Sequence, residues 1–113
     1  MAYDEALAAR LRSLLTGEPG LTEKRMFGGL AFLLGGHMAV VASGRGGLMV
    51  RVDPDRAPSL LARPGVERMV MQGREMAGWL RVLGRPEVDD VADEDLAGWV
   101  AEGVGFVRTL PPK

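Results

Sequence analysis

The residues with the clearest capacity for ligand chemistry stand together in the run Arg25, Met26, Phe27, Gly28 and Gly29. An arginine beside two glycines could bind a carboxylate or phosphate group, because glycine lets backbone N–H groups approach an anion. The alternative is structural: the glycines form a bulge or a close approach at the start of a strand, and Arg25 pairs with a nearby carboxylate. We favour the structural interpretation and keep a small-molecule or anion site at this corner, possibly enzymatic in function, as the alternative.

The chain holds a single histidine, His37, which could act as a general base, a metal ligand or a pH-sensitive group. It directly follows Gly35 and Gly36, so we expect a solvent-exposed turn residue instead. None of the serines and threonines stands in the sequence context of a nucleophile elbow. The sequence therefore predicts no catalytic residue, and we expect a protein that is not an enzyme.

Two further stretches share some features of ligand-binding sequences. Acidic residues concentrate between Glu87 and Asp95, but no histidine or cysteine joins them and the alternate spacing of a calcium loop is missing. We interpret them as carboxylates at a loop and helix start. The stretch from Ser43 to Gly47 could cradle a phosphate, yet a strand rather than a helix follows it, which favours a plain loop. We expect neither a metal nor a cofactor.

Length and composition limit the class of protein. The 113 residues suffice for one domain, which we expect to span residues 1–113. The absence of cysteine excludes disulfides and thiolate zinc sites. A net charge of −1 provides no field that attracts nucleic acid, so we expect weak nucleic-acid binding at most. The acidic N-terminus, and the lack of an apolar run of about 20 residues, predict a cytoplasmic protein without a membrane segment.

Hydrophobic spacing and turn residues predict an α+β domain. Helices are expected at 4–16, at 54–61 and from 90 or 93 to 109, and strands at 30–34, 37–42, 48–52, 66–71 and 78–83. We expect residues 21–26 to be an extended lead into Gly28 and Gly29, and Gly35 and Gly36 to form a two-residue hairpin turn. The order α-β-β-β-α-β-β-α has connections too short for parallel crossovers, which predicts two layers, with helices on an antiparallel sheet.

The predicted strands are apolar on both faces, whereas an antiparallel sheet with one wet face alternates apolar and polar residues. Either helices cover both sides, or another chain completes one face. The candidate interface consists of Met38, Val40, Met49 and Trp79, and methionine suits an adaptable contact surface. We predict a homodimer formed through this face. The rival is a monomer in which the first and last helices each cover one face.

The run from Arg25 to Gly29, followed by an apolar strand and then by Gly36, His37, Met38 and Ala39, resembles the signature of the N-terminal domain of the TfoX/Sxy family. Later stretches match in order, so the resemblance covers nearly the whole chain: Leu48 to Val52, Arg63 to Gly65, Gly73 to Met76, and Gly78 with Trp79.

The family is named for regulators of bacterial DNA uptake, and longer members carry a C-terminal domain that we do not expect within these 113 residues. The resemblance implies a small two-layer domain similar to type III secretion chaperones. It also implies a regulatory or protein-interaction module whose protein partner is unknown.

Overall fold

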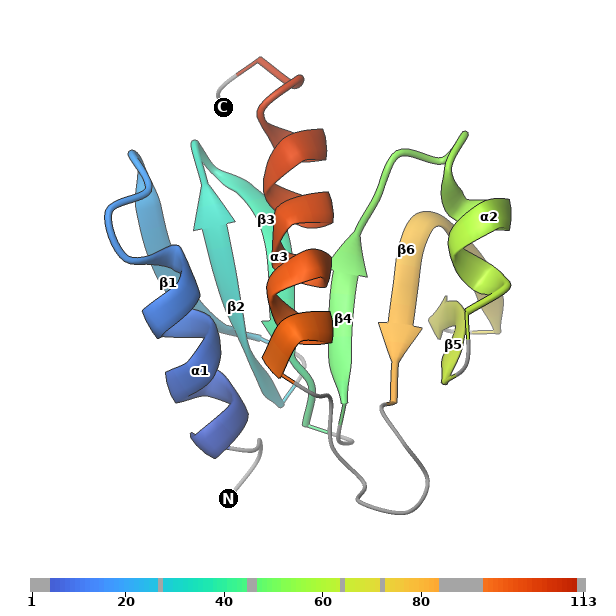
Figure 1. Cartoon of the computed structure of the whole chain (residues 1–113), viewed down its shortest axis with the longest axis horizontal. Coiled ribbons are helices and arrows are strands. Elements are labelled where there is room, and N and C mark those ends of the chain that lie inside the picture. The colour runs from blue at the N-terminus through green and yellow to red at the C-terminus, as the bar shows by residue number, and fades with distance from the viewer. Residues whose placement is uncertain are drawn as a thin grey trace.

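Three helices lie on one face of a six-stranded antiparallel sheet in the described part of the chain (Figure 1). The computed structural model describes residues 5–26, 28–44, 47–63, 65–71, 73–83 and 93–111. The helices are α1 (Glu5–Leu15), α2 (Ala57–Leu61) and α3 (Asp93–Val107). The strands are β1 (Leu21–Met26), β2 (Gly29–Leu34), β3 (His37–Ala42), β4 (Leu48–Arg51), β5 (Val66–Met71) and β6 (Arg74–Val82).

The strands are arranged in the order β1-β2-β3-β4-β6-β5, so β1 and β5 form the edges of the sheet. The predicted α+β class with an antiparallel sheet is confirmed. The predicted element order gains one strand, because Leu21–Met26, expected as an extended lead, pairs with β2 as strand β1. The four residues in the middle of β1 are exposed. The strand lacks an alternating apolar pattern because it lies at an edge.

Gly35 and Gly36 form the predicted two-residue hairpin turn between β2 and β3. Leu34 pairs with His37 across the turn. The φ angles of the two glycines are 59° and 87°. Positive φ at both central residues is what a type I′ turn requires, and glycine adopts it without a steric penalty.

Gly28 and Gly29, at the start of β2, are required by the backbone for two different reasons. Gly28 has a φ of 73° in the turn that joins β1 to β2. Gly29 pairs with Met26, and a Cβ atom added to Gly29 would lie 2.4 Å from the carbonyl oxygen of Ala42. The predicted close approach is therefore found at Gly29, while Gly28 belongs to a hairpin turn rather than to a bulge. Phe27 lies outside the described residues.

One extra residue in β3 changes which side chains face the helices. Phe32 of β2 pairs with Val40, and the neighbouring Leu33 pairs with Met38. Ala39 is therefore the extra residue of a β-bulge. In a regular strand Met38 and Val40 would share one face, but the bulge turns them to opposite faces.

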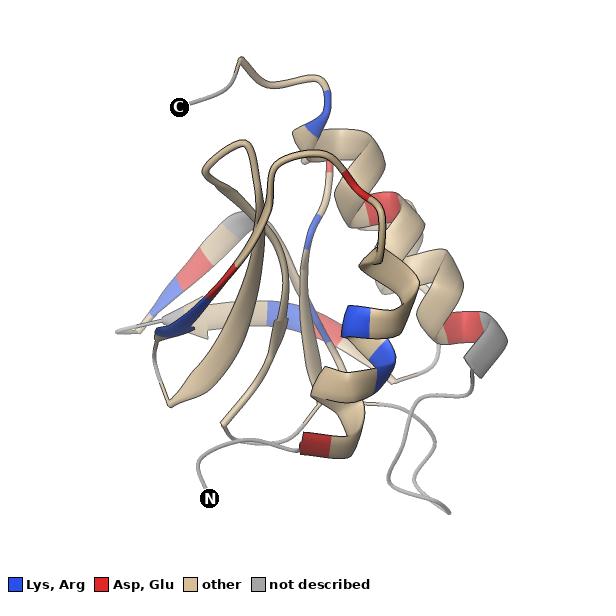
Figure 2. Ribbon diagram, turned by 90° about the vertical axis from the view of Figure 1, so that its left-hand side faces the viewer, with Lys and Arg blue, Asp and Glu red and all other residues tan. Residues whose placement is uncertain are grey.

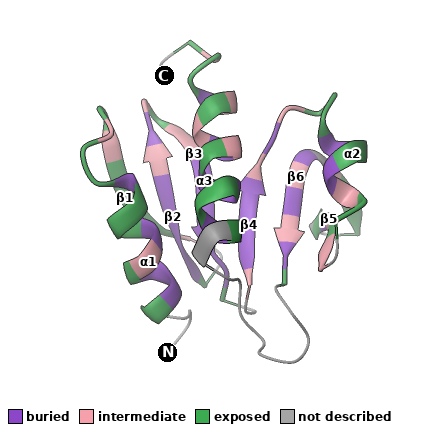
Figure 3. Ribbon diagram, viewed as in Figure 1, coloured by how far each residue is buried: buried purple, intermediate pink, exposed green. Residues whose placement is uncertain are grey.

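The helices bury one face of the sheet in the main hydrophobic core. Figure 3 shows strands that are largely buried beneath helices whose outward surfaces are exposed. Fully buried side chains of this core include Leu11, Phe32, Val40, Val50, Leu80 and Leu96. Helix α3 lies close to β3, because a Cβ atom added to Gly103 would lie 2.8 Å from the carbonyl oxygen of Ala39. A larger residue at this position would push α3 away from the sheet.

An ion pair fastens the edge strand β1 to helix α1. The guanidinium of Arg12 donates two hydrogen bonds to the carboxylate of Glu23, at 2.7 and 2.8 Å. These hydrogen bonds hold the pKa of Glu23 below its ordinary value, and the positive charge of Arg12 acts in the same direction. The pair lies at the surface, so we expect it to stabilise the fold by at most about 1 kcal/mol.

We predict that alanine at Gly29 destabilises the protein by about 2 kcal/mol, because the added Cβ atom clashes with backbone. Alanine at Gly28 should cost about 1 kcal/mol through its positive φ. Gly105→Ala is the control, since nothing lies within 4 Å of the added atom in this helical position, and it should stabilise by up to about 1 kcal/mol. Urea unfolding measures all three variants. A Gly29→Ala variant as stable as the parent would show that the close approach constrains nothing.

The pKa shift of Glu23 predicts how the ion pair responds to acid. A carboxylate with a lowered pKa in the folded state contributes its full stabilisation above the unfolded pKa, near pH 4, and loses it as the pH falls through the folded pKa. The parent should therefore be more stable than Glu23→Gln at neutral pH, and this difference should disappear on acidification. Denaturant unfolding at several pH values measures it. A difference that stays unchanged down to the most acidic pH at which both variants remain folded would contradict the assignment.

Candidate functional site

The face of the sheet opposite the helices carries a second apolar cluster. We call it the methionine face. Its buried members are Ala31, Val41, Met49 and Met69, and its half-buried members are Met26, Leu33, Met38, Met76 and Trp79. These side chains come from all six strands. Figure 2 shows the described helices gathered on the other side of the sheet.

The methionine face differs from the core beneath the helices in its content of methionine. All five methionines whose side chains the structure describes belong to the methionine face, where they make up five of its nine members. Among the described residues of the helix-covered core, none is a methionine. The residues of that core are leucine, valine, alanine, phenylalanine and tryptophan. The two faces therefore use different side chains, although both are apolar.

A bend in β6 brings the β5–β6 hairpin into this cluster. Arg68 pairs with Leu80, but the next pair toward the hairpin turn joins Val70 to Glu75, so β6 has three more residues than β5 between the two pairs. Gly78 lies in this irregular part of β6 with a φ of 79°. As a result, Met69 and Met76 pack with the side chains that the central strands place on the same face.

Three of the four residues predicted as an interface lie on the methionine face, namely Met38, Met49 and Trp79. Met49 is buried among its neighbours there. The prediction for Val40 is wrong, because this side chain is fully buried in the core beneath the helices. The reason is the bulge at Ala39, which regular alternation in β3 does not include.

The structure does not bring the predicted motif residues together. Arg25 to Gly29 lie at one end of β2, and Gly36 and Met38 lie at the opposite end. Arg25 is exposed opposite Leu30, and no carboxylate among the described residues pairs with it. The ion pair expected for Arg25 is therefore not found in this part of the chain. Met26 is half-buried in the methionine face, and Gly29 is buried against Ala42.

His37 is less exposed than the sequence predicts. Its ring is half-buried, and Nε2 lies 2.6 Å from the carbonyl oxygen of Pro111. A carbonyl only accepts hydrogen bonds, so Nε2 carries the hydrogen. The other ring nitrogen, Nδ1, is buried and has no hydrogen-bond partner in the described structure. His37 therefore fastens the start of β3 to the segment that follows α3, instead of pointing freely into solvent.

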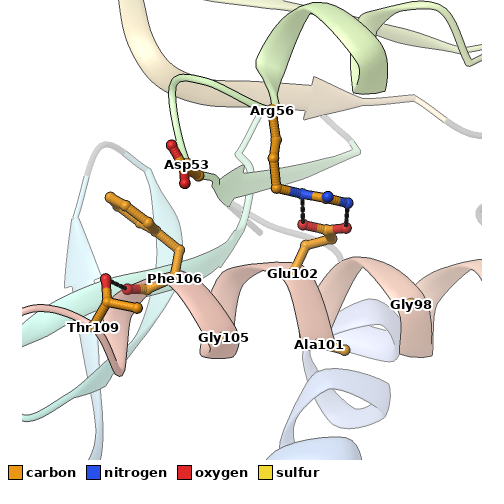
Figure 4. Close-up of a pocket in the computed structure, with 8 residues that line it drawn as sticks. All are labelled: Asp53, Arg56, Gly98, Ala101, Glu102, Gly105, Phe106 and Thr109. Atoms are coloured by element: carbon orange, nitrogen blue, oxygen red, sulfur yellow. Dashed lines mark hydrogen bonds and ion pairs between the residues drawn. The ribbon is translucent and has the colours of Figure 1, made fainter.

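A groove of about 340 Å³ lies beside the outward surface of α3 (Figure 4). Its lining residues are Asp53, Arg56, Gly98, Ala101, Glu102, Gly105, Phe106 and Thr109. Two hydrogen bonds join Arg56 to Glu102, from Nε to Oε2 at 3.1 Å and from Nη2 to Oε1 at 2.5 Å. Hydrogen bonding to Glu102 raises the pKa of Arg56 above its ordinary value.

The polar groups of this groove are already engaged with protein atoms. The hydroxyl of Thr109 donates to the carbonyl of Phe106, and the carboxylate of Asp53 accepts a hydrogen bond from the amide of Asp55. The groove has no signal in the sequence, because it joins residues around Asp53 to residues of α3 that are distant in the chain. The polar side chains of the groove are thus explained by their contacts within the fold, without a ligand.

The described residues contain no group of three or more His, Cys, Asp or Glu side chains placed to hold a metal ion. Within the same residues, no helix is both long enough and apolar enough to cross a membrane.

In a comparison with known protein families, the model of the TfoX N-terminal domain matches residues 13–106. No curated protein and no solved structure matches the chain. The matched range contains the whole sheet and most of α3.

The assignment of Met38 and Val40 to opposite faces predicts opposite outcomes for the same substitution. Lysine at Met38 can lay its aliphatic part along the half-buried surface and keep its ammonium in water, so stability should change by less than about 1 kcal/mol. Lysine at Val40 buries an unpaired charge and should cost about 3 kcal/mol or more. Thermal unfolding of both variants measures the difference. Equal losses would contradict the bulge and the face assignment.

Proposed function

The chain belongs to the TfoX N-terminal domain family, and on this basis, together with the methionine face, we propose that it is a non-enzymatic regulatory or protein-interaction module. The family takes its name from regulators of bacterial DNA uptake. We therefore propose that the chain has a related regulatory role and that it acts in the bacterial cytoplasm.

The observation that carries the proposal is the concentration of methionine on the face of the sheet opposite the described helices. An uncovered face of an antiparallel sheet is ordinarily polar, because it contacts water. Methionine is unbranched and polarisable, so a surface rich in it can adapt to an apolar partner. The five half-buried members of the face keep part of their surface available for such a contact.

The alternative of anion or small-molecule binding at Arg25 to Gly29 is not favoured by a specific observation. The space beside Gly29 is occupied by the carbonyl oxygen of Ala42. Met26 belongs to the methionine face, whereas Arg25, the preceding residue of the strand, lies on the opposite side of β1. These residues thus have separate roles in the fold.

Two kinds of partner are consistent with an interaction module: a second copy of the chain, as predicted from the sequence, and a different protein. Sedimentation at micromolar concentration separates them. A parent that sediments as a dimer, and becomes a monomer when Met38 is changed to lysine, would identify a second copy. A monomeric parent would leave a different protein as the partner.

We predict that partners captured by cross-linking in the native cell are lost when Met38 and Met76 are both changed to lysine. The charged ammonium groups would oppose burial of this face against another protein. The matched control is Leu14→Lys, which replaces an exposed leucine on α1, on the opposite side of the molecule. Capture that both variants retain, with both variants folded, would show that the methionine face is not the interaction surface.

A further inference from the structure

Among the residues that the structure describes, the charged ones around the methionine face are mainly basic. Lys24 lies two residues before Met26 in β1, and Arg74 lies two residues before Met76 in β6, so both share the face of these methionines. Arg81 lies opposite Met49 of the same face. The acidic residue beside them is Glu67, opposite Arg81 in β5.

The helical side of the molecule has the opposite character at α3. The sequence of this helix contains four acidic residues and no lysine or arginine. Lys24, Arg74 and Arg81 outnumber Glu67 and therefore give the described part of the methionine face a positive charge, although the whole chain has a net charge of −1.

This charge distribution argues against a second copy as the occupant. A twofold dimer through the methionine face would place the same surface of each copy against the other. The basic residues of one copy would then approach those of its partner, and like charges oppose association. An occupant with acidic residues at its border would instead be attracted.

The position of the face also limits the structure of the occupant. Backbone N–H and C=O groups inside the sheet are paired with neighbouring strands, so a segment lying across the face cannot obtain hydrogen bonds from them. An extended segment would find unpaired groups only at the edge strands. A helix satisfies its own backbone groups, and α1 and α3 already show that helices pack on this sheet from the other side.

We propose that the methionine face binds an amphipathic helix of another protein, with an apolar stripe that contacts the methionines and acidic residues along its borders. This inference rests on the proposed function and names the partner's chemistry. The half-buried methionines adjust to the apolar stripe, and Lys24 and Arg74 contact the acidic borders.

Two synthetic helical peptides of about five turns test the proposal. They share one apolar stripe of leucine and methionine and differ only in carrying glutamate or lysine at the borders. Anisotropy titrations of labelled peptide with the full chain should show roughly tenfold tighter binding of the glutamate peptide at physiological salt. The preference should shrink at high salt.

Variants of β1 provide a matched pair. Lys24→Glu should weaken the preference for the glutamate peptide, and adding Arg74→Glu in β6 should remove it. Arg25→Glu should preserve it, because Arg25 neighbours Lys24 in the chain but lies on the opposite side of the strand. Met38→Lys should weaken binding of both peptides.

Several results would overturn the proposal: binding of neither peptide, equal binding of both, an equal effect of Arg25→Glu and Lys24→Glu, displacement of the peptide by single-stranded DNA, or a parent dimer that Met38→Lys dissociates. If these peptides fail while the cross-linking experiment still shows partners lost with the methionine variants, only the helix proposal is wrong. If both experiments fail, the proposed function is wrong as well.

Discussion

In β3, the division of apolar side chains between the two faces of the sheet depends on one extra residue, Ala39. After this bulge, Val40 and Ala42 join the core beneath the helices, while Val41 joins the methionine face. The carbonyl oxygen of Ala39 also lies where a side chain on Gly103 would clash. The same point of β3 therefore determines which residues face the helices and how closely α3 packs on the sheet. Bulges are effective at such points because they re-aim side chains without ending the strand.

The two faces of the sheet have different packing requirements, and they are built from different residue types. A permanently covered core is packed most densely by side chains with few alternative rotamers, and its described members here are mainly leucine and valine. A face that meets a separate molecule needs side chains that can change shape, which suits the five methionines of the methionine face. Met69 and Met76 of the β5–β6 hairpin pack with the other members, so the face remains partly buried even without an occupant.

The sequence predicts those features that depend on neighbouring residues. The turn at Gly35 and Gly36 follows from local glycine chemistry, and the apolar character of both faces follows from residue types. The face of Val40 could not be predicted, because a bulge depends on the pairing of β3 with β2. Likewise, β1 lacks the alternating apolar pattern of a half-buried strand, since its middle residues are exposed. The contact of His37 with Pro111 joins residues 74 positions apart.

The edges of the sheet favour a face, rather than an edge, as the proposed site of association. Strand addition at an edge is opposed by charged residues, which must lose water when another backbone approaches. In β1 the exposed run from Thr22 to Arg25 contains three charged residues, and Glu23 is held by α1. In β5, Glu67 and Arg68 are the second and third residues of the strand. With both edges charged and one face covered by helices, the methionine face is the apolar surface of the described sheet that remains suited to binding another molecule.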